Sequence, residues 1–125
     1  MTYQTPAKWH SIAAEIQVVL VEAGTDGMWT IDVKNPKFED LYIQGLRYRV
    51  DSILLQIGNP EDHYEIRAIT TKGWREPDDQ FPNYYISKPW DETTKDEVVD
   101  FLIETFMLLG LNSDTTELEA IVQDL

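Results

Sequence analysis

The chain has 125 residues, of which 23 are acidic and 10 are basic, so its formal net charge is −13. Hydrophobic residues make up 42% and aromatic residues 11% of the chain, which is enough to bury the core of one domain spanning residues 1–125. The acidity argues against nucleic acid and anionic membranes as direct partners, and the absence of cysteine excludes disulfides and thiolate chemistry.

Targeting and membrane segments are not expected in this sequence. No run of 18 apolar residues is present, so no transmembrane helix is predicted. The stretch from Met1 to Pro6 lacks the basic region followed by an apolar region that is typical of a signal peptide. These features favour a cytoplasmic location.

The N-terminal part is predicted to form a helix over residues 6–23. Thr5 and Pro6 form a start signal, with a hydroxyl cap followed by proline at the first helical position. Gly24 is expected to end the helix. Apolar residues recur at spacings of three and four, which places them on one face: Trp9, Ile12, Ala13, Ile16, Val19, Leu20 and Ala23.

The middle of the chain is predicted to form strands. Residues 29–33 alternate between apolar and polar, and Asn35–Pro36 breaks this strand. Over 41–57 the apolar residues change parity twice, with Gly45 and Asp51–Ser52 as candidate bulges or turns. Two short strands and one long bulged strand both remain open there. Further strands are predicted at 64–68 and 84–87, with a loop at 72–83 between them.

Two helices are predicted after the last strand. Thr94 and Glu97 form a capping box ahead of an apolar stripe, which predicts a helix over 94–110. Residues 115–125 are predicted to form a short final helix. The order of elements predicts an α+β fold, in which an antiparallel sheet of four to five strands has N-terminal and C-terminal helices packed on one face.

Sequence patterns that carry catalysis or metal binding are absent. The two histidines, His10 and His63, form no ligand pair, and no serine lies in a G-x-S-x-G context. The adjacent acids Asp78–Asp79 and Asp91–Glu92 could contribute to a Mg²⁺ site, but such pairs are more commonly surface charge. We therefore expect no enzymatic activity, no metal site and no cofactor.

The negative charge is concentrated in the last fifty residues. Residues 1–75 hold 10 acids and 8 bases, net −2, whereas residues 76–125 hold 13 acids and 2 bases, net −11. A solubilising face and a docking surface for a basic protein are both consistent with this pattern. At least two of the large aromatics Trp74, Phe81 and Trp90 are expected to fold into the core. The candidate protein-binding residues are Trp74, Glu76, Asp78, Asp79, Trp90, Asp91 and Glu92.

The combination of these features resembles two groups of proteins. An N-terminal helix, an antiparallel sheet that includes Asp40–Gly58, the acidic and aromatic block Trp74–Trp90 and an acidic C-terminal helix resemble the small acidic immunity proteins of bacterial polymorphic toxin and contact-dependent inhibition systems. This resemblance implies a non-enzymatic protein that neutralises a toxin, for example a nuclease, by binding its basic domain. The element order is also similar to type III secretion chaperone-like and YbjN-like domains, which implies an adaptor that binds an extended segment. A monomer and a dimer both remain open.

Overall fold

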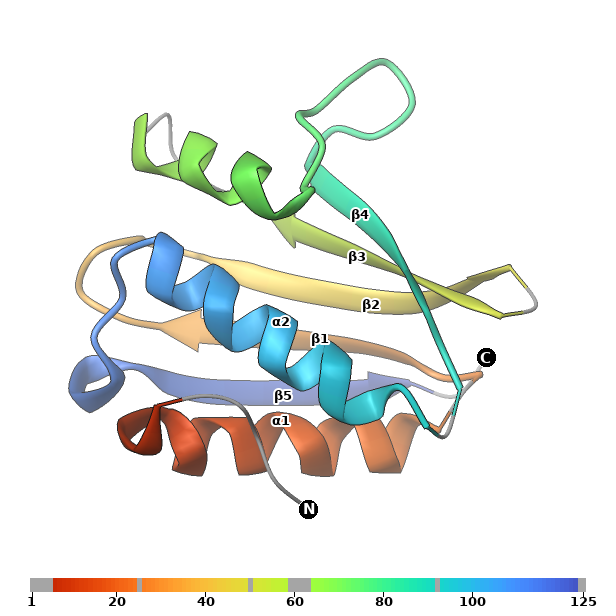
Figure 1. Cartoon of the computed structure of the whole chain (residues 1–125), viewed down its shortest axis with the longest axis horizontal. Coiled ribbons are helices and arrows are strands. Elements are labelled where there is room, and N and C mark those ends of the chain that lie inside the picture. The colour runs from red at the N-terminus through yellow and green to blue at the C-terminus, as the bar shows by residue number, and fades with distance from the viewer. Residues whose placement is uncertain (1–5, 25, 50, 59–63, 92, 124–125) are drawn as a thin grey trace.

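The chain folds into a five-stranded antiparallel sheet with helices on one face, as predicted (Figure 1). The computed structural model describes all residues except 1–5, 25, 50, 59–63, 92 and 124–125, and at 48–49 and 64–67 it describes only the backbone. The strand order is β4-β3-β2-β1-β5. The strands are β1 (Met28–Lys34), β2 (Tyr42–Arg49), β3 (Ser52–Gly58), β4 (Tyr84–Pro89) and β5 (Glu117–Gln123), and the helices are α1 (His10–Ala23) and α2 (Lys95–Leu108).

Helix α1 confirms the helix predicted near the N-terminus, but not its start. Pro6 is the N-cap residue of the first turn, with a ψ of 146°, and not the first helical residue, and Thr5 lies outside the described residues. A 3₁₀ turn, η1 (Ala7–Trp9), precedes it, and the N–H of Trp9 donates to the carbonyl of Pro6 at 2.9 Å. Gly24 ends the helix with a φ of +66°, and its N–H donates to the carbonyl of Leu20. All seven residues of the predicted apolar stripe are buried. None of the described helices is both long enough and apolar enough to span a membrane.

The stretch 41–57 forms two strands, which decides between the two predicted alternatives. Strand β2 ends at Arg49 and β3 begins at Ser52, and the described turn residue Asp51 lies at the expected Asp51–Ser52 position. The register shift lies between Arg47 and Arg49 and not at Gly45. Gly45 is required for another reason, since a Cβ there would lie 2.3 Å from Cζ2 of the Trp29 indole, its partner on β1. The ring therefore packs directly on the backbone of β2.

The predicted strand at 64–68 is wrong, because this segment is a 3₁₀ helix, η2 (Tyr64–Lys72). Ile69 is fully buried, and its parity differs from that of Tyr64, Ile66 and Ala68, on whose alternation the prediction rested. The helix packs beside α2, and Lys72 Nζ lies 3.3 Å from Oε2 of Glu104 on that helix.

The predicted final helix at 115–125 is also wrong, because residues 117–123 form strand β5. This strand pairs along its whole length with β1, from Met28 opposite Gln123 to Lys34 opposite Glu117. Leu118 and Val122 pack against the core, whereas Ile121 is 61% exposed on the other face. A spacing of three and four residues suits either a helix or the alternating faces of a strand in so short a segment.

Helix α2 confirms the second long helix, but its predicted capping box does not form. Thr94 is the N-cap residue, yet its side chain makes no capping hydrogen bond. The Thr94 hydroxyl instead accepts the N–H of Asp91 at 2.9 Å, within the turn that precedes the helix. The hydroxyl therefore bonds within the preceding turn and not to the free N–H groups of the first helical turn.

Helices α1 and α2 cover one face of the sheet, and none of the described helices lies on the other face (Figure 1). Trp29, Ile31 and Val33 of β1 point into the core beneath α1 and α2, where Trp9 contacts Phe106 with ring centroids 6.2 Å apart. Residues of the opposite parity form rows across the other face. One such row follows from the strand registers: Ile121, Thr30, Gln44, Gln56 and Tyr85.

Candidate functional site

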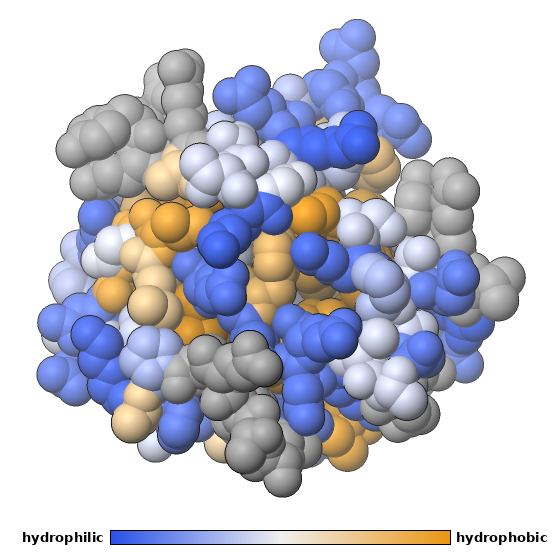
Figure 2. Space-filling view, in the orientation of Figure 1, coloured by the Kyte–Doolittle hydropathy of each residue, from blue (hydrophilic) through white to orange (hydrophobic). Residues whose placement is uncertain are grey.

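The predicted site residues divide into a buried group and an exposed group. Trp74 and Trp90 are 2% and 4% exposed, respectively, so both rings belong to the core. This confirms that at least two large aromatics of this segment fold inward. Glu76, Asp78 and Asp79 are exposed on the loop before β4. In Figure 2, this loop is a hydrophilic projection at the upper right of the molecule.

Trp74 fixes the start of this loop to α2. Its Nε1 donates to Oγ1 of Thr105 at 2.9 Å, and its ring stacks on Phe101 with centroids 5.6 Å apart. The Thr105 hydroxyl in turn donates to the carbonyl of Phe101 at 2.9 Å. The indole thus has its polar atom satisfied inside the core, as buried tryptophan requires.

Asp78 organises the tip of the loop. Its Oδ1 accepts the N–H groups of Gln80 at 2.8 Å and Phe81 at 2.9 Å, and its Oδ2 accepts the hydroxyl of Tyr85 at 2.5 Å. The rings of Phe81 and Tyr85 lie 4.4 Å apart. One carboxylate therefore closes the turn and connects it to β4, so the loop is held in one shape.

A cavity of about 420 Å³ lies between the loop and the sheet. The main chain of Arg75 pairs with Tyr85 through two hydrogen bonds, at 2.8 and 3.1 Å, which closes one side. Leu54 of β3 is only 5% exposed although it lies outside the main core cluster. The remaining lining residues are Gly73, Gln80, Phe81, Ile86 and Ser87.

The hydrogen bond between Asp78 and Tyr85 shifts both ionisations. It lowers the pKa of Asp78 below 3.8, with further help from the N–H of Phe81. It raises the pKa of Tyr85 above 10.0. The lowered pKa means that Asp78 favours the folded loop above pH 3.8 and loses this effect as pH falls through its folded pKa. The raised pKa of Tyr85 favours the folded loop below pH 10.0, and this contribution is lost as pH rises.

Replacing Asp78 with asparagine should lower the pKa of Tyr85. The amide oxygen can still accept the two turn N–H groups, but the negative charge that opposes ionisation of the phenol is gone. A titration followed by the NMR signal of the Tyr85 ring carbon that bears the hydroxyl measures this shift. An unchanged Tyr85 pKa in Asp78→Asn would contradict the role assigned to this carboxylate.

Asp91 lies at the other end of β4 from the loop. The six residues of β4 separate the end of the loop from Asp91, which corresponds to about 20 Å. Its carboxylate accepts the N–H of Thr93 at 2.7 Å and the hydroxyl of Thr93 at 2.6 Å, and these bonds lower its pKa. Glu92 lies outside the described residues. The structure thus groups the first three acids and separates Asp91 from them.

Two residues of the loop site were not selected from the sequence. Phe81 of the loop and Tyr85 of β4 form a ring pair, whereas the sequence indicates Phe81 only as a candidate core aromatic. The local signal for their arrangement is Asp78 three residues before Phe81, a spacing that suits an Asx turn. The register that brings Tyr85 beside it depends on β3 and β4.

The structure describes one of the two histidines. His10 is exposed on α1, and His63 lies outside the described residues. Among the residues that the structure describes, no group of three or more His, Asp or Glu side chains could hold a metal ion.

Comparisons of the chain with protein-family models, curated proteins and solved structures gave no match.

Proposed function

We propose that this chain is a cytoplasmic, non-enzymatic protein-binding domain of the immunity type. It would neutralise a toxin by binding the toxin's basic domain through the loop at 74–83. The observation that carries the proposal is the shape of this loop, in which the Asp78 carboxylate holds an exposed acidic tip against β4. A loop that needs little further ordering loses less conformational entropy when it binds.

Charge supports a basic partner. Glu76 and Asp79 are exposed beside Asp78 on the loop, and the last fifty residues together carry a net charge of −11. Opposite charges steer association and orient the two surfaces, so a cationic groove such as that of a nuclease matches this loop.

The ring pair supports a contact surface at the same place. Phe81 and Tyr85 are half-buried, so part of each side chain faces solvent next to the acids. Aromatic rings beside carboxylates can receive an arginine side chain by stacking and ion pairing. In this arrangement Trp74 supports the loop from the core, and the exposed contact is made by Phe81 and Tyr85.

Reversing two loop charges tests this surface. The double variant Glu76→Lys and Asp79→Lys should slow association with the toxin by about tenfold or more at low salt, because exposed charges mainly set the on-rate. Asp78 is left unchanged because its carboxylate holds the loop. The toxin is first identified by pull-down and mass spectrometry from the native strain, and stopped-flow mixing then measures the rate.

A double variant with the same change in charge provides the control. Glu15→Lys with Glu22→Lys alters two exposed acids of α1 and should slow association much less. Wild-type association should also slow as salt rises, since ions screen exposed charges beyond roughly 8 Å at physiological ionic strength. Equal rates for the two double variants would show that the loop is not the docking surface.

A further inference from the structure

The outer edge of β4 is closed by the protein itself. The N–H and C=O groups of Tyr85 that point away from β3 are hydrogen-bonded to the backbone of Arg75, at 3.1 and 2.8 Å respectively. Main-chain groups that point away from β3 occur at every second residue of β4, so Ser87 is the next residue after Tyr85 with such groups. The outward residue after it, Pro89, has no N–H to offer. This edge is therefore unsuited to pairing with another chain.

The outer edge of β5, by contrast, has no backbone hydrogen-bond partner among the described residues. The N–H of Val33 donates to the carbonyl of Leu41 at 2.8 Å, so the main-chain groups of Val33 point toward β2. The main-chain N–H and C=O groups of successive strand residues point to opposite sides of the strand. Those of Asp32 and Lys34 therefore point toward β5, where the partners of these residues are Glu119 and Glu117. The main-chain groups of the alternate residues of β5 therefore point away from β1. Within the described chain no backbone hydrogen bond outside the β1 ladder involves these residues: Leu118, Ala120 and Val122.

The side chains beside this edge carry excess negative charge. Asp32 and Glu119 are direct cross-strand partners, which is an unfavourable arrangement for two like charges. Lys34 Nζ lies 3.6 Å from Oε2 of Glu119 and is also the cross-strand partner of Glu117. In this group one ammonium faces three carboxylates, so a further cation would be favoured.

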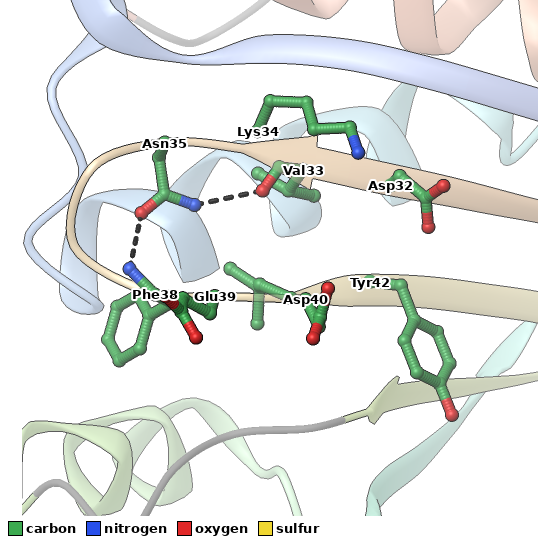
Figure 3. Close-up of a pocket in the computed structure, with 9 residues that line it drawn as sticks. Asp32, Val33, Lys34, Asn35, Phe38, Glu39, Asp40 and Tyr42 are labelled. Carbon is green, nitrogen blue, oxygen red and sulfur yellow. Dashed lines mark hydrogen bonds between the residues drawn. The ribbon is translucent and has the colours of Figure 1, made fainter.

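A cavity of about 560 Å³ adjoins the same end of β1 (Figure 3). Asn35 shapes the loop beside it, because its Nδ2 donates to the carbonyl of Val33 at 2.9 Å and its Oδ1 accepts the N–H of Phe38 at 2.7 Å. The cavity has room for a long side chain, and its carboxylates suit a basic one. Its charged and polar lining includes Asp32, Lys34, Glu39, Asp40 and Tyr42.

We propose that the outer edge of β5 binds an extended basic protein segment, which joins the sheet as an additional strand. Alternate side chains of an added strand lie on opposite faces of the sheet. On the open face they would meet Glu117, Glu119 and Ile121, so basic residues are preferred at two positions and an apolar residue at the third. On the other face, where α1 packs against β5, they would meet Leu118, Ala120 and Val122, which favour small apolar residues.

Charge also decides between this occupant and a second copy of the chain. Two copies that each carry −13 repel one another, whereas a basic segment is attracted. The β5 edge lies at the opposite side of the sheet from the loop before β4. The inference is therefore independent of the proposed function, and either can fail alone.

A synthetic peptide of seven residues, in which two arginines lie two positions apart among valines, serves as the probe. At saturating peptide, hydrogen exchange of the amides of Leu118, Ala120 and Val122 should slow by about tenfold or more, because an added strand protects outward-facing amides. The same peptide with alternate backbone nitrogens methylated keeps its charge but loses its donors, and it should not protect them.

Protein variants separate charge from backbone pairing. Glu117→Gln with Glu119→Gln should weaken peptide binding roughly tenfold, whereas Glu22→Gln with Glu97→Gln removes the same charge elsewhere and should have little effect. Ala120→Pro removes one outward N–H without removing a bond to β1, so it should abolish protection while the protein stays folded. The loop variant Glu76→Lys with Asp79→Lys should bind the peptide normally.

Three outcomes would overturn the inference. In the first, the methylated peptide binds as tightly as its parent, so that only charge is recognised. In the second, amides other than those of β5 become protected. In the third, the β5 amides are protected without peptide and increasingly so at higher protein concentration, which would assign the edge to a second copy of the chain.

Discussion

The variant Ile16→Asp is expected to yield no stably folded protein. Ile16 is 0% exposed on the buried face of α1, in the core cluster between the sheet and the helices. An aspartate there loses the apolar contacts of isoleucine and buries a carboxylate without a partner. The combined cost is on the order of 5 kcal/mol or more, which is comparable to the whole stability of a typical domain.

Val18→Asp provides the matched control on the same helix. Val18 is 56% exposed, so the new carboxylate stays in water. Glu15 and Glu22 lie three and four residues away, and their repulsion should limit the loss to about 1 kcal/mol or less. Circular dichroism and urea unfolding compare the two variants. An Ile16→Asp protein with the unfolding midpoint of Val18→Asp would remove Ile16 from the core.

The two long helices could be predicted because their signals are local. For α1, the spacing of the apolar residues and the glycine at position 24 together define the buried face and the end of the helix. The predicted start of α2 is correct even though its capping box does not form. The position of a helix depends on several consecutive signals, so the loss of one side-chain bond at Thr94 does not move it.

Strand β5 could not be predicted because its partner lies far away in the sequence. Residues 117–123 pair with residues 28–34, and short apolar segments carry little information about such contacts. The same limit applies to η2, because β3 pairs directly with β4 and leaves no place between them for a strand at 64–68. In both segments tertiary contacts determine the secondary structure, and the result differs from what the local alternation or spacing of apolar residues predicts.

The acids of the candidate site could be predicted, but their grouping could not. Exposure of Glu76, Asp78 and Asp79 follows from their charge and the prolines around them. The separation of Asp91 from these acids follows from the length of β4. The predicted strand, 84–87, is two residues shorter than the observed one. The hydrogen bond between Asp78 and Tyr85 joins a turn to a strand. Predicting it therefore requires the correct turn and the correct strand position together.

Trp74→Ala is expected to destabilise the whole domain and to alter the loop only as a consequence. Removing the ring leaves a cavity against Phe101 and takes a hydrogen-bond donor from Thr105, which should cost about 3–5 kcal/mol. Trp74→Phe keeps a ring there and should cost about 1–2 kcal/mol, mainly through the lost hydrogen bond. Urea unfolding measures both values.

The same variants show whether Trp74 acts in binding through the fold or through contact. Because the indole is 2% exposed, Trp74→Phe should bind the toxin at the wild-type rate wherever the protein is folded. Phe81→Ala, at the exposed side of the loop, should instead weaken binding while changing the unfolding midpoint little, since the Asp78 turn remains. If Trp74→Phe lost binding with full stability and Phe81→Ala did not, the indole would have to leave the core to meet the partner, and the loop would not act in the shape described.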